Sequence, residues 1–218
     1  MRRIKFGNGS LYHIFTKSIA GYRIFNHSLD YKRFLLSSKY YQVPRKVSFS
    51  TYIRLNKIEN YEIPIEYLTE DEFIVKIITY CLMPTHIHFI LQQLKDKGIS
   101  TFMNNVLNSY SRYFNLKIKR KGPLWEGRFK SVLIESDEQL IHLTRYIHLN
   151  PVTAYIVDKP EKWQYSSYQE YCEEVKKEEI LCNFHDILDI KADSYKRFVE
   201  DNISFQRELS KIKKLLIE

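Results

Sequence analysis

Short apolar runs and longer helical stripes alternate along the first part of the chain. Runs rich in β-branched and aromatic residues predict strands at residues 11–16, 74–81 and 129–135. A further run, LMPTHIHFIL at residues 82–91, is broken by Pro84 and continues as a strand. We expect this strand to pair with its predecessor across the turn at Pro84.

Helices are predicted where apolar residues recur three and four positions apart. One runs from Asp30 to a stop at Pro44, and a long one follows an N-cap at Ser100. A third follows a capping box that begins at Ser136, and we expect it to end at Pro151. Hairpin-forming strands separated by long helices, without a regular βαβ rhythm, indicate an α+β fold with an antiparallel sheet.

Two regions fit this alternation less well. Residues 43–67 mix local alternation with Asn-rich breaks, and we interpret them as an insertion or a helix-poor excursion. From Trp163 onward the pattern is helical. We therefore expect residues 1–172 to form the main domain and residues 173–218 to form an acidic, helical C-terminal extension.

The composition is that of an ordinary globular protein, with 44% hydrophobic and 28% charged residues. No stretch approaches the roughly 18 apolar residues of a membrane span, and the N-terminus lacks the apolar core of a signal peptide. The three cysteines show no CxxC spacing, which argues against a disulfide framework or a cysteine-based zinc site. The sequence predicts a cytoplasmic protein with no membrane partner.

Charge is distributed unevenly along the chain. Residues 169–218 contain 12 acidic and 9 basic residues, whereas residues 1–168 contain 14 acidic and 25 basic ones. Basic side chains neutralise phosphates, and interleaved aromatic rings can stack on unpaired bases. The densest basic run therefore predicts nucleic-acid binding; the alternative is a solvated face over buried aromatic residues. The predicted DNA-binding residues in this run are Arg112, Lys117, Lys119, Arg120, Lys121, Arg128 and Lys130.

Two histidines occupy alternate positions in the strand of residues 82–91. Residues two apart in a strand point to the same face, so His86 and His88 should direct two imidazoles at one point, with Cα atoms about 6–7 Å apart. That separation allows two ring nitrogens to bind one metal ion. Alone, such a pair is a weak signal, because most such pairs arise by chance or are ordinary polar residues on a solvated face.

The helix ending at Pro151 contains the second informative pattern, RYIHLNP. Tyr146 and Asn150 are four residues apart, so one helix face presents a potential nucleophile and an oxygen donor for a metal ion. A tyrosine hydroxyl, with an ordinary pKa near 10, must be activated before it attacks. Tyr110 and Tyr113 are alternative nucleophiles, but neither has an amide or carboxylate four residues on, and both lie in an apolar helical stripe.

These motifs occur in the order found in one family. Residues 11–171 resemble the IS200-like single-tyrosine (Y1) transposases of the His-hydrophobic-His superfamily, including the REP-associated tyrosine transposases. The chain departs from the family's pattern at Thr85, where Asn is usual, and at residues 17–19, where Arg-Gly-Asn is common. The matching blocks are LYHIFTKSIAGYRIF, TYCLMPTHIHFIL, GISTFMNNVLNSYSRYFN, GPLWEGRFKSVLIE and LIHLTRYIHLNPV.

The resemblance implies a ferredoxin-like fold in residues 1–172 that cuts and rejoins single-stranded DNA through a 5′-phosphotyrosine. Carried over by position, Tyr146 is the nucleophile, and His86, His88 and Asn150 bind Mg²⁺ or Mn²⁺. Asn150 stands where insertion-sequence relatives use Gln, and it agrees with the REP-associated branch. The expected partner is single-stranded or hairpin DNA, bound by a monomer or a homodimer.

Two other functions are open at this point. The same fold could bind single-stranded or hairpin DNA without cutting it, although all four expected site residues are present. Alternatively, His86 and His88 could hold the metal of a DNA hydrolase that forms no covalent intermediate. A covalent protein–DNA adduct would distinguish the transposase from both.

Overall fold

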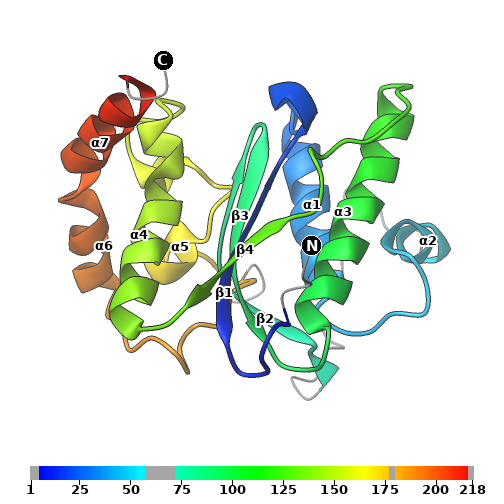
Figure 1. Cartoon of the computed structure of the whole chain (residues 1–218), viewed down its shortest axis with the longest axis horizontal. Coiled ribbons are helices and arrows are strands. Elements are labelled where there is room, and N and C mark those ends of the chain that lie inside the picture. Colours follow the sequence, from blue (N-terminus) through cyan, green and yellow to red (C-terminus); the bar gives the residue numbers. More distant parts are fainter. Residues whose placement is uncertain (1–4, 57–71, 177–179, 216–218) are drawn as a thin grey trace.

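A four-stranded antiparallel sheet forms the centre of the computed structural model, which describes residues 5–56, 72–176 and 180–215. The strand order is β2-β3-β1-β4. Helices cover both faces of this sheet (Figure 1). The strands are β1 (Leu11–Lys17), β2 (Val75–Met83), β3 (His86–Gln93) and β4 (Lys130–Ile134).

The helices are divided between the two faces. α1 and α3 lie on one face, and α4 to α7 lie on the other (Figure 1). Within the described ranges, no helix is long and apolar enough to cross a lipid bilayer. The α+β, ferredoxin-like fold expected from the sequence is confirmed. The helices are α1 (Ser28–Tyr40), α2 (Phe49–Leu55), α3 (Gly98–Lys117), α4 (Asp137–Thr153), α5 (Tyr168–Tyr171), α6 (Ala192–Glu200) and α7 (Ile203–Leu215), with 3-10 turns at Ile19–Gly21 and Pro160–Lys162.

Adjacent residues of β3 show how the two faces differ. The ring of Phe89 contacts Phe34 of α1 and Phe102 of α3, with centroids 6.3 and 6.0 Å away. The preceding residue, His88, instead contacts Tyr146 of α4. Because side chains alternate along a strand, the α1/α3 face is apolar core and the α4 face carries the imidazoles.

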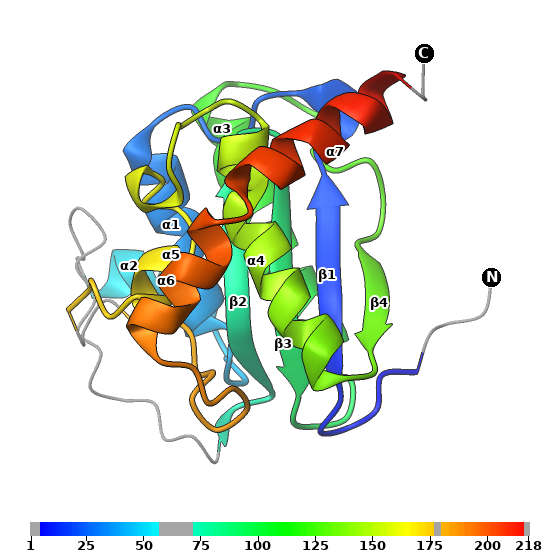
Figure 2. The ribbon, with the colours of Figure 1, turned by 90° about the vertical axis from the view of Figure 1, so that its left-hand side faces the viewer.

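The α4 face of the sheet is only partly covered. In Figure 2, α4 crosses in front of β2 and β3 and leaves β4 and much of β1 open. Val132 of β4, which pairs with His13 on this face, is accordingly 50% exposed, whereas β2 is buried almost throughout. An open strip of sheet therefore runs beside the helix that carries Tyr146.

α4 continues to Thr153, so the prediction that Pro151 ends the helix was wrong. Proline has no backbone N–H to donate to the carbonyl four residues earlier, which is that of Ile147. The side chain of Asn150 supplies a donor instead, because its Nδ2 lies 3.4 Å from the Ile147 oxygen and 3.0 Å from the Tyr146 oxygen. These two hydrogen bonds hold the Asn150 amide in one orientation.

The start of α3 also differs from the prediction. The helix begins at Gly98 rather than after a cap at Ser100, and Lys97 before it has a φ of 61°. A Cβ at residue 98 would collide with the carbonyl oxygen of Ile74. Close approach of Ile74, the residue before β2, to the helix therefore requires glycine at this position.

The segment interpreted as an insertion or a helix-poor excursion contains α2. Ser48 caps this helix, and its Oγ accepts the backbone N–H of Thr51 at 3.2 Å. The low-helix interpretation is therefore wrong for residues 49–55. The remainder of the segment, from residue 57, lies outside the described residues.

The C-terminal helices pack onto α4. The Tyr195 hydroxyl of α6 donates to Thr144 Oγ1 at 2.9 Å and lies 2.7 Å from Nδ1 of His148. Nε2 of His148 lies 2.8 Å from Ser167 Oγ, which closes a buried polar network. Residues 173–218 thus contribute side chains to the same core as residues 1–172, and the boundary between them stays a prediction.

Candidate active site

His86 and His88 lie at the start of β3 on the α4 face, with ring centroids 5.2 Å apart and planes at 82°. Burial lowers the pKa of His86 to about 4 and that of His88 well below the usual 6.5, and the charge of Lys17 adds to both effects. Both imidazoles are therefore neutral at physiological pH. Each can offer a ring lone pair without first releasing a proton.

A third histidine, not predicted from the sequence, lies beside this pair. Nε2 of His13 in β1 is 3.0 Å from Nδ1 of His88, and the two rings stack at 14° with centroids 5.2 Å apart. Burial lowers the pKa of His13 to about 4. When His88 donates this hydrogen bond from Nδ1, its Nε2 keeps the lone pair that a metal ion requires.

Thr85, which departs from the family's pattern, holds the ring of His86 much as His13 holds that of His88. Its Oγ1 lies 3.0 Å from Nδ1 of that ring. His86 and His88 are thus both held through Nδ1. This arrangement leaves Nε2 of each ring as the candidate ligand atom.

Tyr146 faces the histidines from α4. Its ring is perpendicular to that of His88, with centroids 6.1 Å apart, and its side chain is 36% exposed. Burial raises the Tyr146 pKa above the ordinary value of 10, although a hydrogen bond with Asn150 opposes this effect. The phenol therefore holds its proton at neutral pH and must lose it during any attack.

The alternative nucleophiles lie on α3, on the other face of the sheet. The Tyr110 hydroxyl is buried and donates to the Ile24 carbonyl at 2.7 Å. The Tyr113 hydroxyl donates to Asp30 Oδ1 at 2.8 Å. Both tyrosines therefore have structural partners and lie away from the imidazoles.

The candidate metal ligands comprise two imidazoles and one amide. Asn150 uses Nδ2 for the carbonyls of α4, which leaves Oδ1 as its ligand atom. Among the described residues, no group of three or more His, Cys, Asp or Glu side chains is arranged to hold a metal ion. Two neutral nitrogens and an amide oxygen fit Mn²⁺, and they fit Mg²⁺ when water completes the coordination.

Two basic residues flank the histidines on the open strip. Lys130 of β4 pairs with Phe15, which in turn pairs with His88. Lys17, which the sequence did not single out, pairs with His86. Directly paired residues of antiparallel strands lie on the same face, so both ammonium groups border the candidate site.

The other predicted DNA-binding residues lie elsewhere. Lys119, Arg120 and Lys121 follow the end of α3, and the Arg120 guanidinium donates to Pro123 O at 2.7 Å. Arg128, just before β4, is exposed. Arg112 and Lys117 lie on α3, away from the histidines. The basic run is therefore spread over several surfaces of the molecule.

Two aromatic residues interleaved with these charges belong to the core. Phe114 is fully buried and Trp125 is 8% exposed. They cannot stack on bases in this structure. The alternative interpretation, in which the aromatic residues of the basic run are buried, holds for these two.

Comparison with known proteins agrees with the motifs. Residues 57–150 match the family described as Transposase IS200 like, and this range contains all four candidate site residues. Over 110 residues the chain is 28% identical to a Haemophilus influenzae protein named "Putative REP-associated tyrosine transposase". That match covers 46% of this chain and 62% of the relative's length.

The fold has a counterpart among solved structures. A REP-associated tyrosine transposase bound to a REP hairpin aligns with a TM-score of 0.53 at 14% identity, over 88% of this chain and 95% of that one. At such low identity the likeness concerns the fold. The resemblance inferred from the motifs is confirmed: the chain is similar in sequence to the IS200-like transposases, a family of enzymes, and in fold to a REP-associated tyrosine transposase.

Proposed function

We propose that the protein is a metal-dependent transposase that cuts and rejoins single-stranded DNA through a 5′-phosphotyrosine at Tyr146. One observation carries the proposal. The ring of the partly exposed Tyr146 stands perpendicular to the neutral ring of His88, with centroids 6.1 Å apart, and Asn150 follows one helical turn later. This combination supplies a nucleophile beside three potential metal ligands.

The reaction would proceed by direct displacement at phosphorus. The phenolic oxygen of Tyr146 bonds to phosphorus while the bond from phosphorus to the 3′ oxygen of the preceding nucleotide breaks. The phenol loses its proton, and the departing oxygen gains one to become a free 3′-OH. Rejoining reverses these steps, so it needs no nucleotide triphosphate, because the phosphotyrosine conserves the phosphodiester bond energy.

The site residues divide the remaining tasks. Nε2 of His86, Nε2 of His88 and Oδ1 of Asn150 would hold Mg²⁺ or Mn²⁺, which when bound would act as a Lewis acid toward the phosphate oxygens. Lys17 and Lys130 would attract the backbone of a strand lying along the open strip of β1 and β4. The other basic residues predicted to bind DNA would hold more distant parts of the substrate.

The proposal extends to partners and location. The substrate is single-stranded or hairpin DNA, and the protein acts in the cytoplasm as a monomer or a homodimer. Residues 1–172 form the catalytic domain. The alternatives, a non-cutting DNA-binding protein and a hydrolase without covalent intermediate, become outcomes of the test.

The test is to trap the adduct. Single strands drawn from the DNA flanking the gene are incubated with the protein and Mn²⁺, denatured, and analysed by peptide mapping. We expect DNA linked to Tyr146, no adduct with Tyr146→Phe, and a normal adduct with the control Tyr113→Phe. Cutting without an adduct would support the hydrolase, and binding without cutting would support the non-catalytic protein. A link to another tyrosine would overturn the assigned site.

A further inference from the structure

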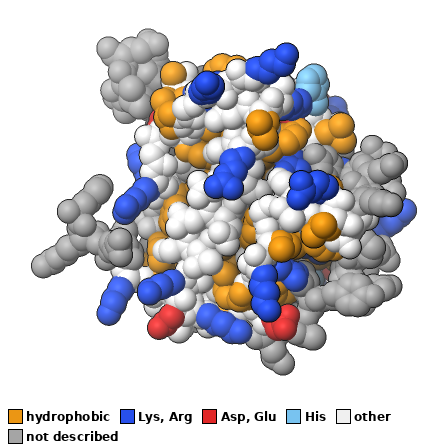
Figure 3. Space-filling model, turned by 90° about the vertical axis from the view of Figure 1, so that its right-hand side faces the viewer, with side chains coloured by type: hydrophobic (Ala, Val, Ile, Leu, Met, Phe, Trp, Pro, Cys, Tyr) orange, Lys and Arg blue, Asp and Glu red, His pale blue; other side chains and the backbone are white. Residues whose placement is uncertain are grey.

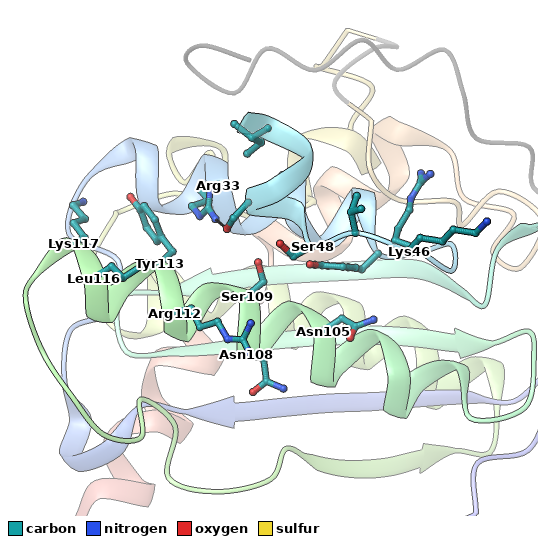
Figure 4. Close-up of a pocket in the computed structure, with 15 residues that line it drawn as sticks. Arg33, Lys46, Ser48, Asn105, Asn108, Ser109, Arg112, Tyr113, Leu116 and Lys117 are labelled. Carbon is teal, nitrogen blue, oxygen red and sulfur yellow. Dashed lines mark hydrogen bonds between the residues drawn. The ribbon is translucent and has the colours of Figure 1, made fainter. Parts of the chain in front are cut away.

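A group of cations lies on the α1/α3 side of the sheet, opposite the histidines. Arg45, Lys46 and Arg112 are among the residues that line a groove of about 870 Å³ there, between α2 and α3 (Figure 4). On the face shown in Figure 3, Lys and Arg side chains are far more frequent than Asp and Glu. Because the sheet stands between this groove and Tyr146, these cations cannot touch a phosphate that Tyr146 attacks.

The α4 face of the sheet has cations of its own, and they differ in position. Arg145 of α4 is turned toward α6, with its guanidinium 4.3 Å from the centroid of the Phe198 ring. Lys130 lies on β4, which β1 separates from the histidine strand. Lys17 lies on β1 and pairs directly with His86, which places the two Cβ atoms about 4.5–5.5 Å apart. Lys17 is therefore the cation that adjoins the candidate ligands.

The backbone around Lys17 is fixed beside the histidine strand. The Ser18 N–H donates to the carbonyl of Thr85, the residue before His86, at 2.8 Å, and the Glu126 N–H donates to the Lys17 carbonyl at 3.0 Å. The Lys17 side chain is exposed and forms no ion pair within the described residues. Its ammonium group thus extends from a fixed position and has no protein anion paired with it.

The charge of Lys17 acts on both candidate histidine ligands. Burial is the main cause of the low pKa values of His86 and His88, and the Lys17 charge lowers both further. A nearby positive charge has this effect because it disfavours the protonated ring. The register and the electrostatics therefore agree that the ammonium group borders the pair.

Lys17 and Tyr146 approach the histidines from different sides. Tyr146 comes from α4, which crosses over β2 and β3, whereas Lys17 comes from β1, which α4 leaves largely open (Figure 2). In a direct displacement at phosphorus, the attacking and departing oxygens lie roughly in line, on opposite sides of the phosphorus. A phosphate held at the histidines and attacked by Tyr146 would therefore turn its departing oxygen toward β1.

We propose that Lys17 is a catalytic residue of the strand-cutting reaction and that its ammonium group stabilises the departing 3′ oxygen. The inference rests on the proposed function and names the group that acts opposite Tyr146. As the bond from the Tyr146 oxygen to phosphorus forms, the bond to the 3′ oxygen breaks and negative charge develops on that oxygen. An Nζ–H of Lys17 donates a hydrogen bond to this charge. The 3′ oxygen then takes a proton from water, the phenol proton passes to water, and Lys17 stays charged throughout.

The test uses a strand whose leaving group needs little stabilisation. Sulfur replaces the bridging 3′ oxygen at the cut position, which is first located from the 3′ end that wild type releases. A thiol has an ordinary pKa of about 8.5, far below that of a hydroxyl group, so a thiolate departs readily. With the ordinary strand and Mn²⁺, Lys17→Gln should slow adduct formation by about 100-fold, the usual effect of removing one donor to a developing oxyanion. With the sulfur strand, Lys17→Gln should react nearly as fast as wild type.

Two further variants separate leaving-group stabilisation from attraction of DNA. Lys17→Arg keeps a charged donor and restores the residue common at this position in the resembling family, so it should retain most of the rate with the ordinary strand. The matched control is Lys130→Gln, which removes one positive charge from the same face. Any slowing in Lys130→Gln should be equal for the ordinary and the sulfur strand.

Equal losses of Lys17→Gln on the two strands would overturn the proposal, because Lys17 would then only attract DNA. Recovery of Lys130→Gln by sulfur would also overturn it, since the effect would not be specific to Lys17. Calorimetry with Mn²⁺ and no DNA should give wild-type affinity in Lys17→Gln, and a loss large enough to explain the slowing would count against the proposal. Circular dichroism melts compare the folds, with Lys17→Met as a second neutral variant. If wild type forms no adduct with either strand, it is the proposed function that fails.

Discussion

Nε2 of His13 and Nδ1 of His88 lie 3.0 Å apart, although 75 residues separate them in the chain. The contact arises because β1 pairs with β3, and the His13 ring is also stacked against Phe15 at 4.9 Å. A ring held on one side by packing and on the other by a hydrogen bond has little freedom to turn. His13 is therefore suited to fix the orientation of His88 without itself contacting substrate.

His13→Ala should weaken Mn²⁺ binding by about 10–100-fold, the usual effect of removing a partner that orients a metal ligand. Isothermal titration calorimetry with Mn²⁺ and protein alone measures this without any DNA. His13→Gln, which keeps a hydrogen-bonding group, should recover part of the affinity. The control is His142→Ala, an exposed histidine on α4. Wild-type affinity in His13→Ala would show that His88 needs no such support.

Local spacing accounts for the residues that the sequence identified. His86 and His88 follow from the two-residue period of a strand, and Tyr146 with Asn150 follows from the four-residue period of a helix. His13 was not predicted as a site residue because its role depends on which strands pair and in what register. Alternation alone places it on the face opposite Tyr12 and Ile14, but not beside a particular partner.

Failures of the sequence rules have equally specific causes. Proline usually ends a helix because it has no N–H to donate. Here the Asn150 side chain donates to the Ile147 carbonyl in place of the missing N–H of Pro151. The low-helix interpretation failed at residues 49–55 because α2 is too short for its pattern to be recognised. Packing of the buried Phe49 stabilises this helix. The groove between α2 and α3 could not be predicted from the sequence, because the residues that line it are far apart in the chain and meet only in the folded structure.

Asp30 connects α1 to α3 through a buried carboxylate. Oδ1 accepts from Lys117 at 2.6 Å and Tyr113 at 2.8 Å, and Oδ2 accepts the N–H groups of Asn26 and His27 at 3.0 Å. Burial alone would raise the Asp30 pKa, but these hydrogen bonds outweigh it and hold the pKa below its ordinary value. The charged form is therefore favoured by folding.

Because the folded pKa is depressed, Asp30 contributes stability above its unfolded pKa of about 4 and loses it as pH falls through the folded pKa. Asp30→Asn should lower the free energy of unfolding at pH 7 by about 2–3 kcal/mol, as expected for lost charge-assisted hydrogen bonds. In Asp30→Asn the free energy of unfolding should also fall less steeply as the pH is lowered. Urea melts between neutral and acidic pH measure both effects. An exposed control, Asp158→Asn, should leave the midpoint unchanged, and an Asp30→Asn melt as steep in acid as wild type would contradict the assignment.

Glu170 has the opposite pH dependence. Burial raises its pKa, and the N–H groups of Leu181 and Cys182, 3.0 and 2.7 Å from Oε2, offset this only in part. A raised carboxyl pKa means that the folded state binds the proton more tightly. Stability is then greatest below the unfolded pKa of about 4.3 and declines as pH rises through the folded value.

Glu170→Gln removes the buried charge and keeps one acceptor oxygen for these N–H groups. We expect a higher thermal midpoint than wild type at pH 8 and little difference at pH 4, with Glu174→Gln on the surface as the control. Differential scanning calorimetry at the two pH values makes the comparison. A midpoint that falls equally at both pH values would mean that Gln disrupts the packing and that the charge is not the cause.

Tyr195 tests whether the C-terminal helices matter to the helix that carries the nucleophile. Tyr195→Phe leaves Nδ1 of His148 on α4 without its buried partner. It also removes the donor to Thr144 Oγ1, which keeps only its bond to the Ile141 carbonyl. An unpaired buried polar group costs about 1–3 kcal/mol, so the thermal midpoint should fall, whereas the exposed control Tyr155→Phe should match wild type. Because Thr144 and His148 flank Tyr146 in sequence, amide hydrogen exchange along α4 should also quicken in Tyr195→Phe. A lower midpoint with unchanged exchange in α4 would show that α6 stabilises the core without holding the helix of the candidate site.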